Sequence, residues 1–465
     1  MDDNVHLVLA SRSKFGFPDL PLLIGRKQVK GIDISDLAFR AEEIKTYLEL
    51  KLNQPVPLED CRSLETRTEG WITGLLLFAY HGWGLLVDQG KALKVTGANI
   101  GDYFESQIYE KQAGWAQDLM LKTSLLDEFN AETCSVIFGE PEGNSWNDLI
   151  ALLLENNLFV ELIEDRGPWL RYHNLYKDFL QAKLAEDENK RWKLLELVYH
   201  HHLSQQDWEK AFAAARTIDD PRVMAETIEQ ASSPLFHAGR INLLAEWLEI
   251  LPEEGYEVCP RLKILNGAIT TIIENPISGF KIIDDLLNLD AIRATRDLYL
   301  KGLVSRATTY RLLGQYNKAL SDIDTIFDSN TTQVEDLNIL GEAYRESGLI
   351  LNHLGKYTNS INSFRKSLDT YKQKQDYKNL ALVHLDMGLV LMEHGDFDAS
   401  MNHFQQALKT WTSQNNYPKL SILHNNLGIL RLFTGDFPGS KEDLIIAISY
   451  AEKTSNIRMQ AFSLA

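Results

Sequence analysis

The sequence predicts a mainly α-helical protein in which an α-solenoid follows a winged-helix domain, a small helical domain and the partial edge of an α/β domain. The solenoid is predicted because one short sequence motif recurs four times in the last third of the chain. The winged helix is predicted because two short apolar runs flank a Gly-Pro turn directly after helical patterns. The α/β edge is predicted from a short apolar run near the N-terminus, typical of a buried parallel strand.

The recurring motif is a glycine followed two residues later by an aromatic residue. Its copies begin at Gly314, Gly355, Gly395 and Gly435, at intervals of 41, 40 and 40 residues. Small residues lie seven positions before and five positions after these glycines: Ala307, Gly348, Gly388 and Gly428, then Ala319, Ser360, Ser400 and Ser440. We expect each glycine to end a helix in the left-handed conformation, and the aromatic residue to begin the next helix and fill the gap between the pair. The small residues then mark close approaches of two helix backbones.

Such hairpins bury their apolar stripes only against their neighbours, so the array is expected to be a solenoid with a concave wall suited to binding. The pattern resembles the tetratricopeptide repeat in a longer, 40-residue form. The residues on that family's signature positions are Gly388, Leu391, Gly395, Phe397, Phe404 and Ala407, with Ser400 where alanine is commoner. Residues 207–211 and 239–252 read as degenerate copies of the same unit.

Composition narrows the classes of function. A length of 465 residues suggests about three domains, and no apolar run reaches the length of a membrane-spanning helix. The formal net charge of -18 argues against direct nucleic-acid binding by this chain, because phosphate neutralisation needs clustered Lys and Arg. Cys61, Cys134 and Cys259 are widely spaced and odd in number, so they indicate buried thiols in a cytoplasmic protein without a signal peptide.

The N-terminal third divides into an α/β remnant and a small helical domain. Residues 1–36 contain the apolar run His6–Ala10, expected to be a buried strand, and Gly31–Ser35, expected to be a second strand. Residues 37–111 change to a helical period, with Ile44 and Leu48 on one face after two glutamates placed for a first helical turn. Further helices are expected around Cys61 and from the Gly-Trp-Ile sequence at 70–72 through Leu77 and Phe78.

The rest of the chain divides into three segments. Residues 112–186 are expected to form a winged helix, with strands over 158–163 and 169–172 and a following helix that Asn174 caps. Residues 187–300 are expected to hold degenerate helical repeats. Residues 301–465 form the predicted tetratricopeptide array.

Three motifs give the whole chain a resemblance to the LuxR-class large ATP-binding transcriptional regulators, typified by the maltose-regulon activator. These regulators are among the signal-transduction ATPases with numerous domains. The motifs are His6-Leu-Val-Leu-Ala-Ser-Arg12, Leu64-Glu-Thr-Arg-Thr-Glu-Gly-Trp-Ile-Thr-Gly-Leu75 and Leu170-Arg-Tyr-His-Asn-Leu-Tyr-Lys-Asp-Phe-Leu180.

The resemblance implies a nucleotide switch and assigns roles to four residues. Arg12 would sense the terminal phosphate, and Gly70 and Trp71 would lie near the adenine. His173 would reach the diphosphate of ADP and lock the winged helix onto the nucleotide domain at rest. A cation and an imidazole donor are chemically suited to phosphate.

The chain departs from that family in the elements that handle phosphate. No Gly-x-x-x-x-Gly-Lys-[Ser/Thr] loop occurs in the sequence, and no apolar strand ends in acidic residues that could hold Mg²⁺. Ile72 also stands where many relatives have proline, and no DNA-binding helix-turn-helix follows the repeats. We therefore expect a non-enzymatic middle part of a longer regulator that has no cofactor of its own, and that uses ATP or ADP only with a phosphate-binding loop supplied upstream.

Structural interpretations remain open for the candidate residues. Arg12 can be a surface ion-pair residue, and His173 a hydrogen-bonded core histidine. His200, His201 and His202 are consecutive, so on a helix they point about 100° apart and indicate a solvated face rather than a metal site. No catalytic triad or paired-carboxylate pattern indicates a hydrolase.

Two functions are compatible with the sequence. The first is the sensor and switch portion of an ATP-dependent transcriptional regulator, whose superhelix binds an inducer or a partner protein and whose intact parent self-associates. The second is an ATP-independent tetratricopeptide scaffold that mediates protein–protein interaction. No membrane partner is expected in either case.

Overall fold

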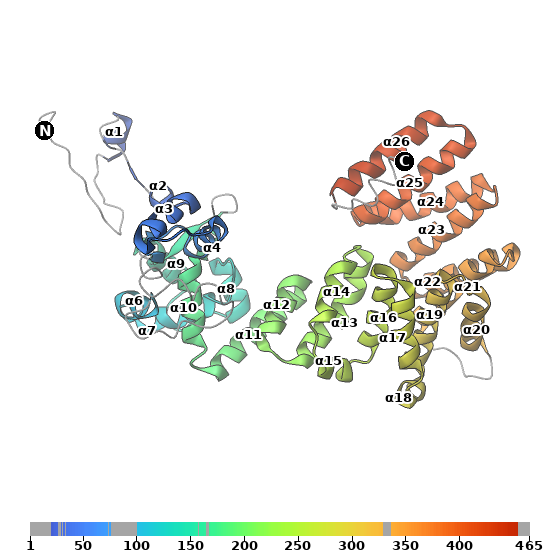
Figure 1. The fold of residues 1–465 in the computed structure, drawn as a ribbon, viewed down its shortest axis with the longest axis horizontal. Helices are drawn as coiled ribbons and strands as arrows, with labels where there is room; N and C mark the ends of the chain where they lie inside the picture. Colours follow the sequence, from blue (N-terminus) through green and yellow to red (C-terminus); the bar gives the residue numbers. More distant parts are fainter. Residues whose placement is uncertain are drawn as a thin grey trace, which may run out of the picture. The chain divides into compact units, whose positions relative to one another are not determined.

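The computed structural model describes residues 20–26, 29, 31–32, 34–72, 74–75, 100–156, 158–163, 167–328 and 336–453. These residues form two compact units, Met1–Ile218 and Asp219–Ala465. Figure 1 shows that both are built almost entirely of helices, as the sequence predicts. Within the described ranges, no helix combines the length and the apolar character needed to cross a membrane.

The first unit begins with the small helical part. Its helices are α1 (Leu20–Gly25), α2 (Ile34–Leu37), α3 (Ala41–Leu52) and α4 (Leu58–Thr68). Helix α3 carries two glutamates in its first turn and buries Ile44 and Leu48 against Cys61 and Leu64 of α4, as expected.

One expectation in this region is wrong. Residues 34–37 form a short helix, so the second strand expected over Gly31–Ser35 is not present. The apolar Ile-Asp-Ile sequence there is too short to distinguish a strand from one helical turn. The strand expected at His6–Ala10 and the residues Leu77 and Phe78 lie outside the described residues.

The winged helix follows, and its two strands form where the apolar runs predict them. Strands β1 (Val160–Leu162) and β2 (Leu170–Tyr172) are antiparallel, with Val160 opposite Tyr172 and Leu162 opposite Leu170. The helices around them are α6 (Ile100–Phe104), the π-helix η2 (Glu105–Tyr109), α7 (Gly114–Thr123), α8 (Ala131–Phe138), α9 (Trp146–Glu155) and α10 (Asn174–Leu184). A hairpin of α11 (Glu188–Ser204) and α12 (Trp208–Ile218) completes the unit.

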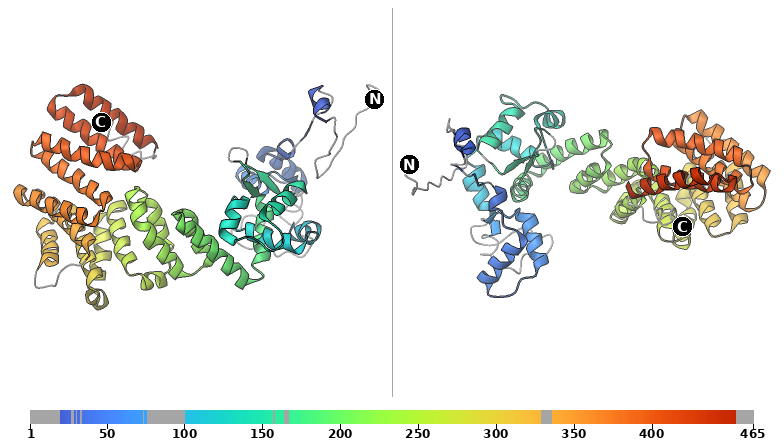
Figure 2. Two further views of the ribbon diagram at one scale, coloured as in Figure 1. Left: turned by 180° about the vertical axis from the view of Figure 1, so that it is seen from behind. Right: turned by 90° about the horizontal axis from the view of Figure 1, so that it is seen from above.

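The second unit is a continuous array of helices that pack mainly on their sequence neighbours (Figures 1 and 2). They are α13 (Pro221–His237), α14 (Ile241–Glu249), α15 (Glu253–Val258), α16 (Arg261–Ile273), α17 (Pro276–Leu287), α18 (Asp290–Ala294), α19 (Arg296–Leu312), α20 (Tyr316–Phe327), α21 (Leu337–His353), α22 (Tyr357–Lys374), α23 (Tyr377–Glu393), α24 (Phe397–Ser413), α25 (Tyr417–Thr434) and α26 (Phe437–Lys453). Such nearest-neighbour packing defines an α-solenoid.

The four predicted turns have the expected geometry. Gly314, Gly355, Gly395 and Gly435 have φ values of 72°, 73°, 80° and 82°, in the left-handed region. The aromatic residue two positions later is the first residue of α20, α22, α24 or α26. In each copy of the motif, the glycine therefore ends one helix and the aromatic residue begins the next, as predicted.

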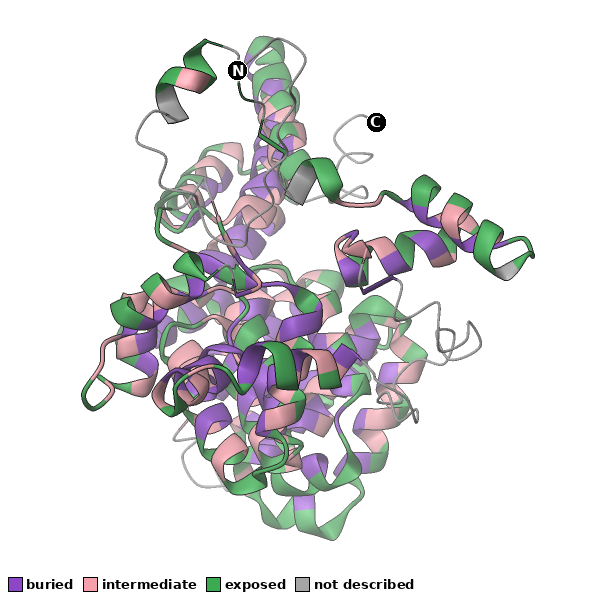
Figure 3. Ribbon diagram, turned by 90° about the vertical axis from the view of Figure 1, so that its left-hand side faces the viewer, coloured by how far each residue is buried: buried purple, intermediate pink, exposed green. Residues whose placement is uncertain are grey.

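The small residues are close helix contacts, also as predicted. A Cβ atom added to Gly388 would lie 2.5 Å from Cε1 of the buried Phe404, and one added to Gly348 would lie 2.8 Å from Cε1 of Phe364. The hydroxyl groups of Ser360 and Ser400 donate to the backbone oxygens of Gly348 and Gly388 at 2.7 and 2.8 Å. Figure 3 shows the result as helices that are buried on one face and exposed on the other.

The aromatic residues of the motif also pack on the next hairpin, which the sequence did not predict: Tyr316 stacks on His353, and the ring centroid of Tyr357 lies 4.1 Å from that of His394. Tyr316, Tyr357 and Phe397 are partly buried against core that includes their own hairpins. Phe437, in the last described hairpin, is 65% exposed.

The cysteines match the expectation in part. Cys61 and Cys134 are buried and free, and burial raises the pKa of Cys134 to about 12. Cys259 is only partly buried, and its thiol donates to Oε2 of Glu229 at 3.2 Å.

Candidate functional site

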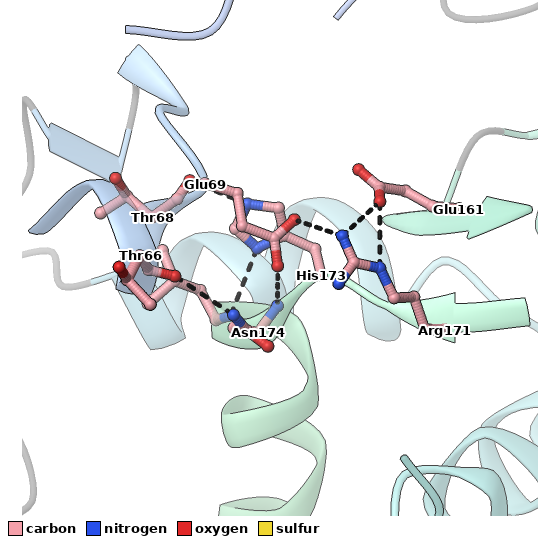
Figure 4. A network of polar contacts seen from close by, with 8 residues as sticks. Thr66, Thr68, Glu69, Glu161, Arg171, His173 and Asn174 are labelled. Atoms are coloured by element: carbon pink, nitrogen blue, oxygen red, sulfur yellow. Dashed lines mark hydrogen bonds and ion pairs between the residues drawn. The ribbon is translucent and has the colours of Figure 1, made fainter. Parts of the chain in front are cut away.

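The candidate site lies where the small helical part meets the winged helix, and His173 is at its centre. His173 follows β2 and is the N-cap of α10, with a side chain that is only 4% exposed. Its Nδ1 accepts the backbone N–H of Leu175 at 3.2 Å, and its Nε2 lies 2.9 Å from the backbone oxygen of Thr68. Because a carbonyl oxygen can only accept, Nε2 carries the proton and the ring is the neutral tautomer. Figure 4 shows the ring between the two elements.

Asn174 strengthens the same junction. Its side-chain Nδ2 donates to the backbone oxygen of Thr66 at 3.2 Å, and its backbone N–H donates to Oε1 of Glu69 at 3.3 Å. Asn174 was expected to cap α10, and this is wrong. His173 caps the helix, which leaves the Asn174 amide free to bind α4 (Figure 4).

These bonds join two helix ends of opposite polarity. The last carbonyl groups of α4 and the first N–H groups of α10 lack partners within their own helices. Their partial charges are negative and positive, respectively, so the two ends attract each other. We call this junction, made by Thr66, Thr68, Glu69, His173 and Asn174, the α4–α10 contact.

A surface ion-pair network flanks the contact. Arg171 donates from Nη2 and Nε to Oε2 of Glu161 at 2.8 and 3.1 Å, across the two paired strands. Its Nη2 also lies 3.9 Å from Oε2 of Glu69. The hydrogen bond to Glu161 raises the pKa of Arg171. Because the Arg171 side chain is 48% exposed, these pairs orient Glu69 more than they stabilise the fold.

Gly70 permits the chain to turn away from α4 at this point. It has φ of +73°, and its backbone oxygen accepts the N–H of Phe39 at 2.9 Å. A Cβ atom at Gly70 would lie 2.6 Å from both the N and the O atoms of Phe39. Only glycine therefore fits this position, for conformational and steric reasons together.

Trp71 extends the contact into the core of the winged helix. Its ring is stacked on Phe104 at a centroid distance of 5.8 Å and meets the edges of Phe159 and His173 at 5.1 and 6.0 Å. A Cβ atom at Gly74 would lie 2.9 Å from the Trp71 ring. The Gly-Trp motif is thus the packing surface by which the small helical part is attached to the winged helix.

The structure brings together three of the four candidate residues. Gly70, Trp71 and His173 form one cluster although about a hundred residues separate the first two from the third. Arg12 lies outside the described residues. The partners of His173 were not found from the sequence, because the Thr68 acceptor is a backbone oxygen, which every residue possesses. The Ser/Thr-rich end of α4 offers no other signal.

The described ranges contain no group of three or more His, Cys, Asp or Glu side chains that could hold a metal ion. His200, His201 and His202 lie near the end of α11, where His200 is exposed and the other two are partly buried. Burial lowers the pKa of His202. The three rings follow one another around the helix, as their consecutive positions require.

The fold and the contact together define the class of protein: a winged helix attached to a small helical domain and followed by an array of tetratricopeptide-type hairpins. Comparison with known families agrees with this class. Residues 105–192 match the MalT winged helix domain, and residues 339–413 match the tetratricopeptide repeat.

Individual proteins extend the similarity. The chain is 26% identical over 278 residues to the HTH-type transcriptional regulator MalT of Klebsiella pneumoniae (strain 342), and 25% identical over the same length to that of Yersinia pestis (strain Pestoides F). Each alignment covers 57% of this chain and 30% of the regulator. A signal transduction ATPase with numerous domains (STAND) that has a tetratricopeptide repeat sensor, from Pyrococcus horikoshii, has a similar fold. Its TM-score is 0.59 at 16% identity, with 92% of this chain and 62% of that chain covered.

The resemblance to MalT-like regulators is therefore confirmed: the chain contains a MalT-type winged helix and tetratricopeptide repeats, and it resembles the sensor region of regulatory proteins. These modules are non-catalytic in character. The chain spans less than a third of the length of the curated regulators it matches and under two thirds of the Pyrococcus protein.

Proposed function

We propose that the chain is the sensor and switch portion of an ATP-dependent transcriptional regulator. The observation that supports this most directly is the α4–α10 contact, in which His173 and Asn174 join the start of α10 to the end of α4 by hydrogen bonds. A junction of a few hydrogen bonds between helix ends is suited to a switch, because it can open without unfolding either element.

The donors at the contact are of the chemical kinds that bind phosphate oxygens. The imidazole Nε2–H of His173, the backbone N–H of Asn174 and the Arg171 guanidinium all lie at or beside the N-terminus of α10, which is a favourable place for an anion. At present the carboxylate of Glu69 accepts the Asn174 N–H, and the Thr68 oxygen accepts the His173 N–H. Bound ADP would supply phosphate oxygens that compete with Glu69 and Thr68 for these two donors.

The remaining parts of the proposal come from the resemblance. Arg12 would face the terminal phosphate, and Gly70 and Trp71 would lie beside the adenine, with a phosphate-binding loop supplied from upstream. An inducer or partner protein bound to the repeat array would favour release of the winged helix and self-association of the intact regulator. The chain itself is proposed not to hydrolyse ATP and not to bind nucleic acid directly.

The second candidate function is an ATP-independent scaffold, and a specific observation favours it. Both nitrogen atoms of His173 already have partners within the described part of the chain, and the ring is buried. A static junction between α4 and α10 requires no ligand beyond these two partners. In that case the repeat array would bind a partner protein without any coupled movement of the winged helix.

Hydrogen exchange on the full chain separates the two functions. In a switch, the amides at the N-terminus of α10 and the end of α4 exchange by local opening. Their free energy of opening is lower than that of the amides in the β1–β2 hairpin. In a static joint, both sets exchange together in the same global event. Equal protection would therefore reject the switch and retain the scaffold.

His173→Asn provides a matched variant for the same measurement. Asparagine is a good N-cap, so α10 keeps its first hydrogen bond, but its shorter side chain does not reach the Thr68 oxygen. We expect faster exchange in α4 with little change in the later turns of α10. Reading the coding DNA upstream of Met1 for an in-frame phosphate-binding loop is a complementary test, because its presence favours the switch.

A further inference from the structure

The first unit contains a cavity between the winged helix and the α11–α12 hairpin. Its volume is about 410 Å³, which is within the range of small-molecule sites. Helix α11 packs on α8 and α10 of the winged helix and also on α12, so it connects the two walls of the cavity. The cavity is separate from the α4–α10 contact, because none of the five residues of that contact lines it.

The lining of the cavity follows the helical period of the sequence. Four lining residues of α11 recur at intervals of four, three and four positions, so they share one face of the helix. They are Arg191, Leu195, Val198 and His202. The other helices contribute Thr133 and Ile137 from α8, Lys177 and Gln181 from α10, and Lys210, Ala214 and Thr217 from α12.

The part of the cavity between Arg191 and His202 has an apolar wall. The side chains that form it are each less than a tenth exposed: Leu126, Ile137, Leu195, Val198 and Ala214. From Arg191 to Val198 the wall is about 10 Å long, at about 1.5 Å of helix per residue. A small molecule with an extended apolar body can lie along this wall.

The acidic residues on the lining already have cationic partners. The pairs are Asp127 with Lys177 at 2.7 Å (Oδ1 to Nζ), Asp207 with Lys210 at 3.6 Å (Oδ2 to Nζ), and Glu128 with Arg171, on which its charge acts. Burial lowers the pKa of His202, so its neutral ring is favoured. These groups therefore give a cationic ligand no unpaired carboxylate to bind.

Arg191 is a cation on the lining that has no acidic partner. Its Nη2 donates to the backbone oxygen of Thr217 at 3.5 Å, which is long for a hydrogen bond. No Asp or Glu side chain in the described part of the chain pairs with this guanidinium, which is partly buried. Because a guanidinium has five N–H groups in a planar fork, donors remain for a carboxylate.

We propose that this cavity binds a small amphipathic organic anion, with its carboxylate on Arg191 and its apolar body along Leu195 and Val198. Two parallel hydrogen bonds from Arg191 would hold the carboxylate, and burial would remove the apolar body from water. A small molecule is favoured over a protein segment because helices α8, α10, α11 and α12 all border the space. The bound molecule would contact the winged helix and the hairpin at once. The inference goes beyond the proposed function, since it requires neither a nucleotide nor opening of the α4–α10 contact.

Isothermal titration of the full chain tests the site, with octanoate and acetate as the two probes. Octanoate should bind saturably with a Kd below about 1 mM, and acetate, which has the carboxylate without the apolar body, should not saturate below about 50 mM. Arg191→Met should weaken octanoate binding at least about tenfold, because the charge-assisted hydrogen bonds are lost. The matched control is Arg216→Met, which removes an exposed arginine of α12 that does not line the cavity and should leave binding unchanged.

Two further variants separate binding from damage to the fold. Arg191→Lys keeps the positive charge and should bind octanoate more tightly than Arg191→Met. Ala214→Leu fills part of the apolar wall and should abolish binding while hydrogen exchange in α11 stays slow.

The proposal is overturned if the wild-type chain does not saturate with octanoate up to about 10 mM, or if Arg191→Met binds it as tightly as the wild type. Acetate binding as strong as that of octanoate would also overturn it, because the apolar wall would then contribute nothing. None of these results depends on the α4–α10 contact, whose opening is measured separately by hydrogen exchange.

Discussion

Replacing Gly70 by alanine is the most direct test of how the small helical part is attached. Gly70 has φ of +73°, and the new Cβ atom would lie 2.6 Å from the N and O atoms of Phe39. Those are backbone atoms, and the Phe39 N–H is already bonded to the Gly70 oxygen. Neither atom can rotate aside as a flexible side chain could, so the hydrogen bond and the turn after α4 must both shift.

The expected loss has two components. A left-handed conformation costs an alanine about 1–2 kcal/mol. Overpacking against a fixed neighbour adds about 1–3 kcal/mol, for a total of about 2–5 kcal/mol. Gly355→Ala is the matched control, since Gly355 also has φ of +73° but nothing lies within 4 Å of its Cβ position. It should lose only the first component.

Local stability is the quantity to measure, because a chain with two units does not unfold in one step. Hydrogen exchange followed by mass spectrometry reports it for α3 and α4 in Gly70→Ala, and for α21 and α22 in Gly355→Ala. At least about thirtyfold faster exchange is expected in the first variant and about tenfold in the second. Equal acceleration would refute the reasoning, because it would mean that Phe39 moves away without loss.

Three further predictions concern the repeats and the nucleotide. Burial, followed by the charge of the adjacent His403, lowers the pKa of His384 to about 4, so the folded array favours the neutral ring. The contribution of neutral His384 to stability is complete above about pH 6.5 and is lost as the pH falls toward 4. Urea unfolding midpoints of the array, measured between pH 8 and 4, should show this decline. A flat profile would contradict the prediction. Gly388→Ala should destabilise its repeat by about 1–3 kcal/mol, because the new Cβ atom contacts Phe404. Adding Phe404→Leu should recover part of the protection from hydrogen exchange. Additive losses in the double variant would argue against the contact. Fluorescent ADP titrated into the full chain should not saturate below about 1 mM, and saturation at micromolar nucleotide would show that this chain binds ADP without an upstream loop.

The repeat array could be predicted from the sequence because its information is local. A glycine that ends a helix and the residue that begins the next one lie within three positions of each other. A small residue and its neighbour across the hairpin recur at a fixed spacing. Four copies in phase therefore specify the hairpins, and the β1–β2 pair could be predicted for the same reason, since only a few residues separate its apolar runs in the sequence.

The site could be predicted only in part. Gly70, Trp71 and His173 were identified through a family resemblance, and the structure places them in one cluster. Their partners are backbone oxygens at the end of α4 and rings of the winged-helix core, which have no signature of their own. The exchange of roles between His173 and Asn174 was missed for a related reason: either side chain can cap a helix, and the position of α4 determines which one does.

The sequence by itself determined the hairpins, their period and the winged helix, and the family resemblance pointed to Gly70, Trp71 and His173. The tertiary structure alone decided which groups His173 and Trp71 meet, that the aromatic residues of the motif pack between hairpins, and that Asn416 bonds to His237. The physical reason is the sequence separation of the residues that interact. Turns and helix caps depend on neighbours a few positions away, whereas contacts across 105 or 179 residues depend on how the elements between them pack together.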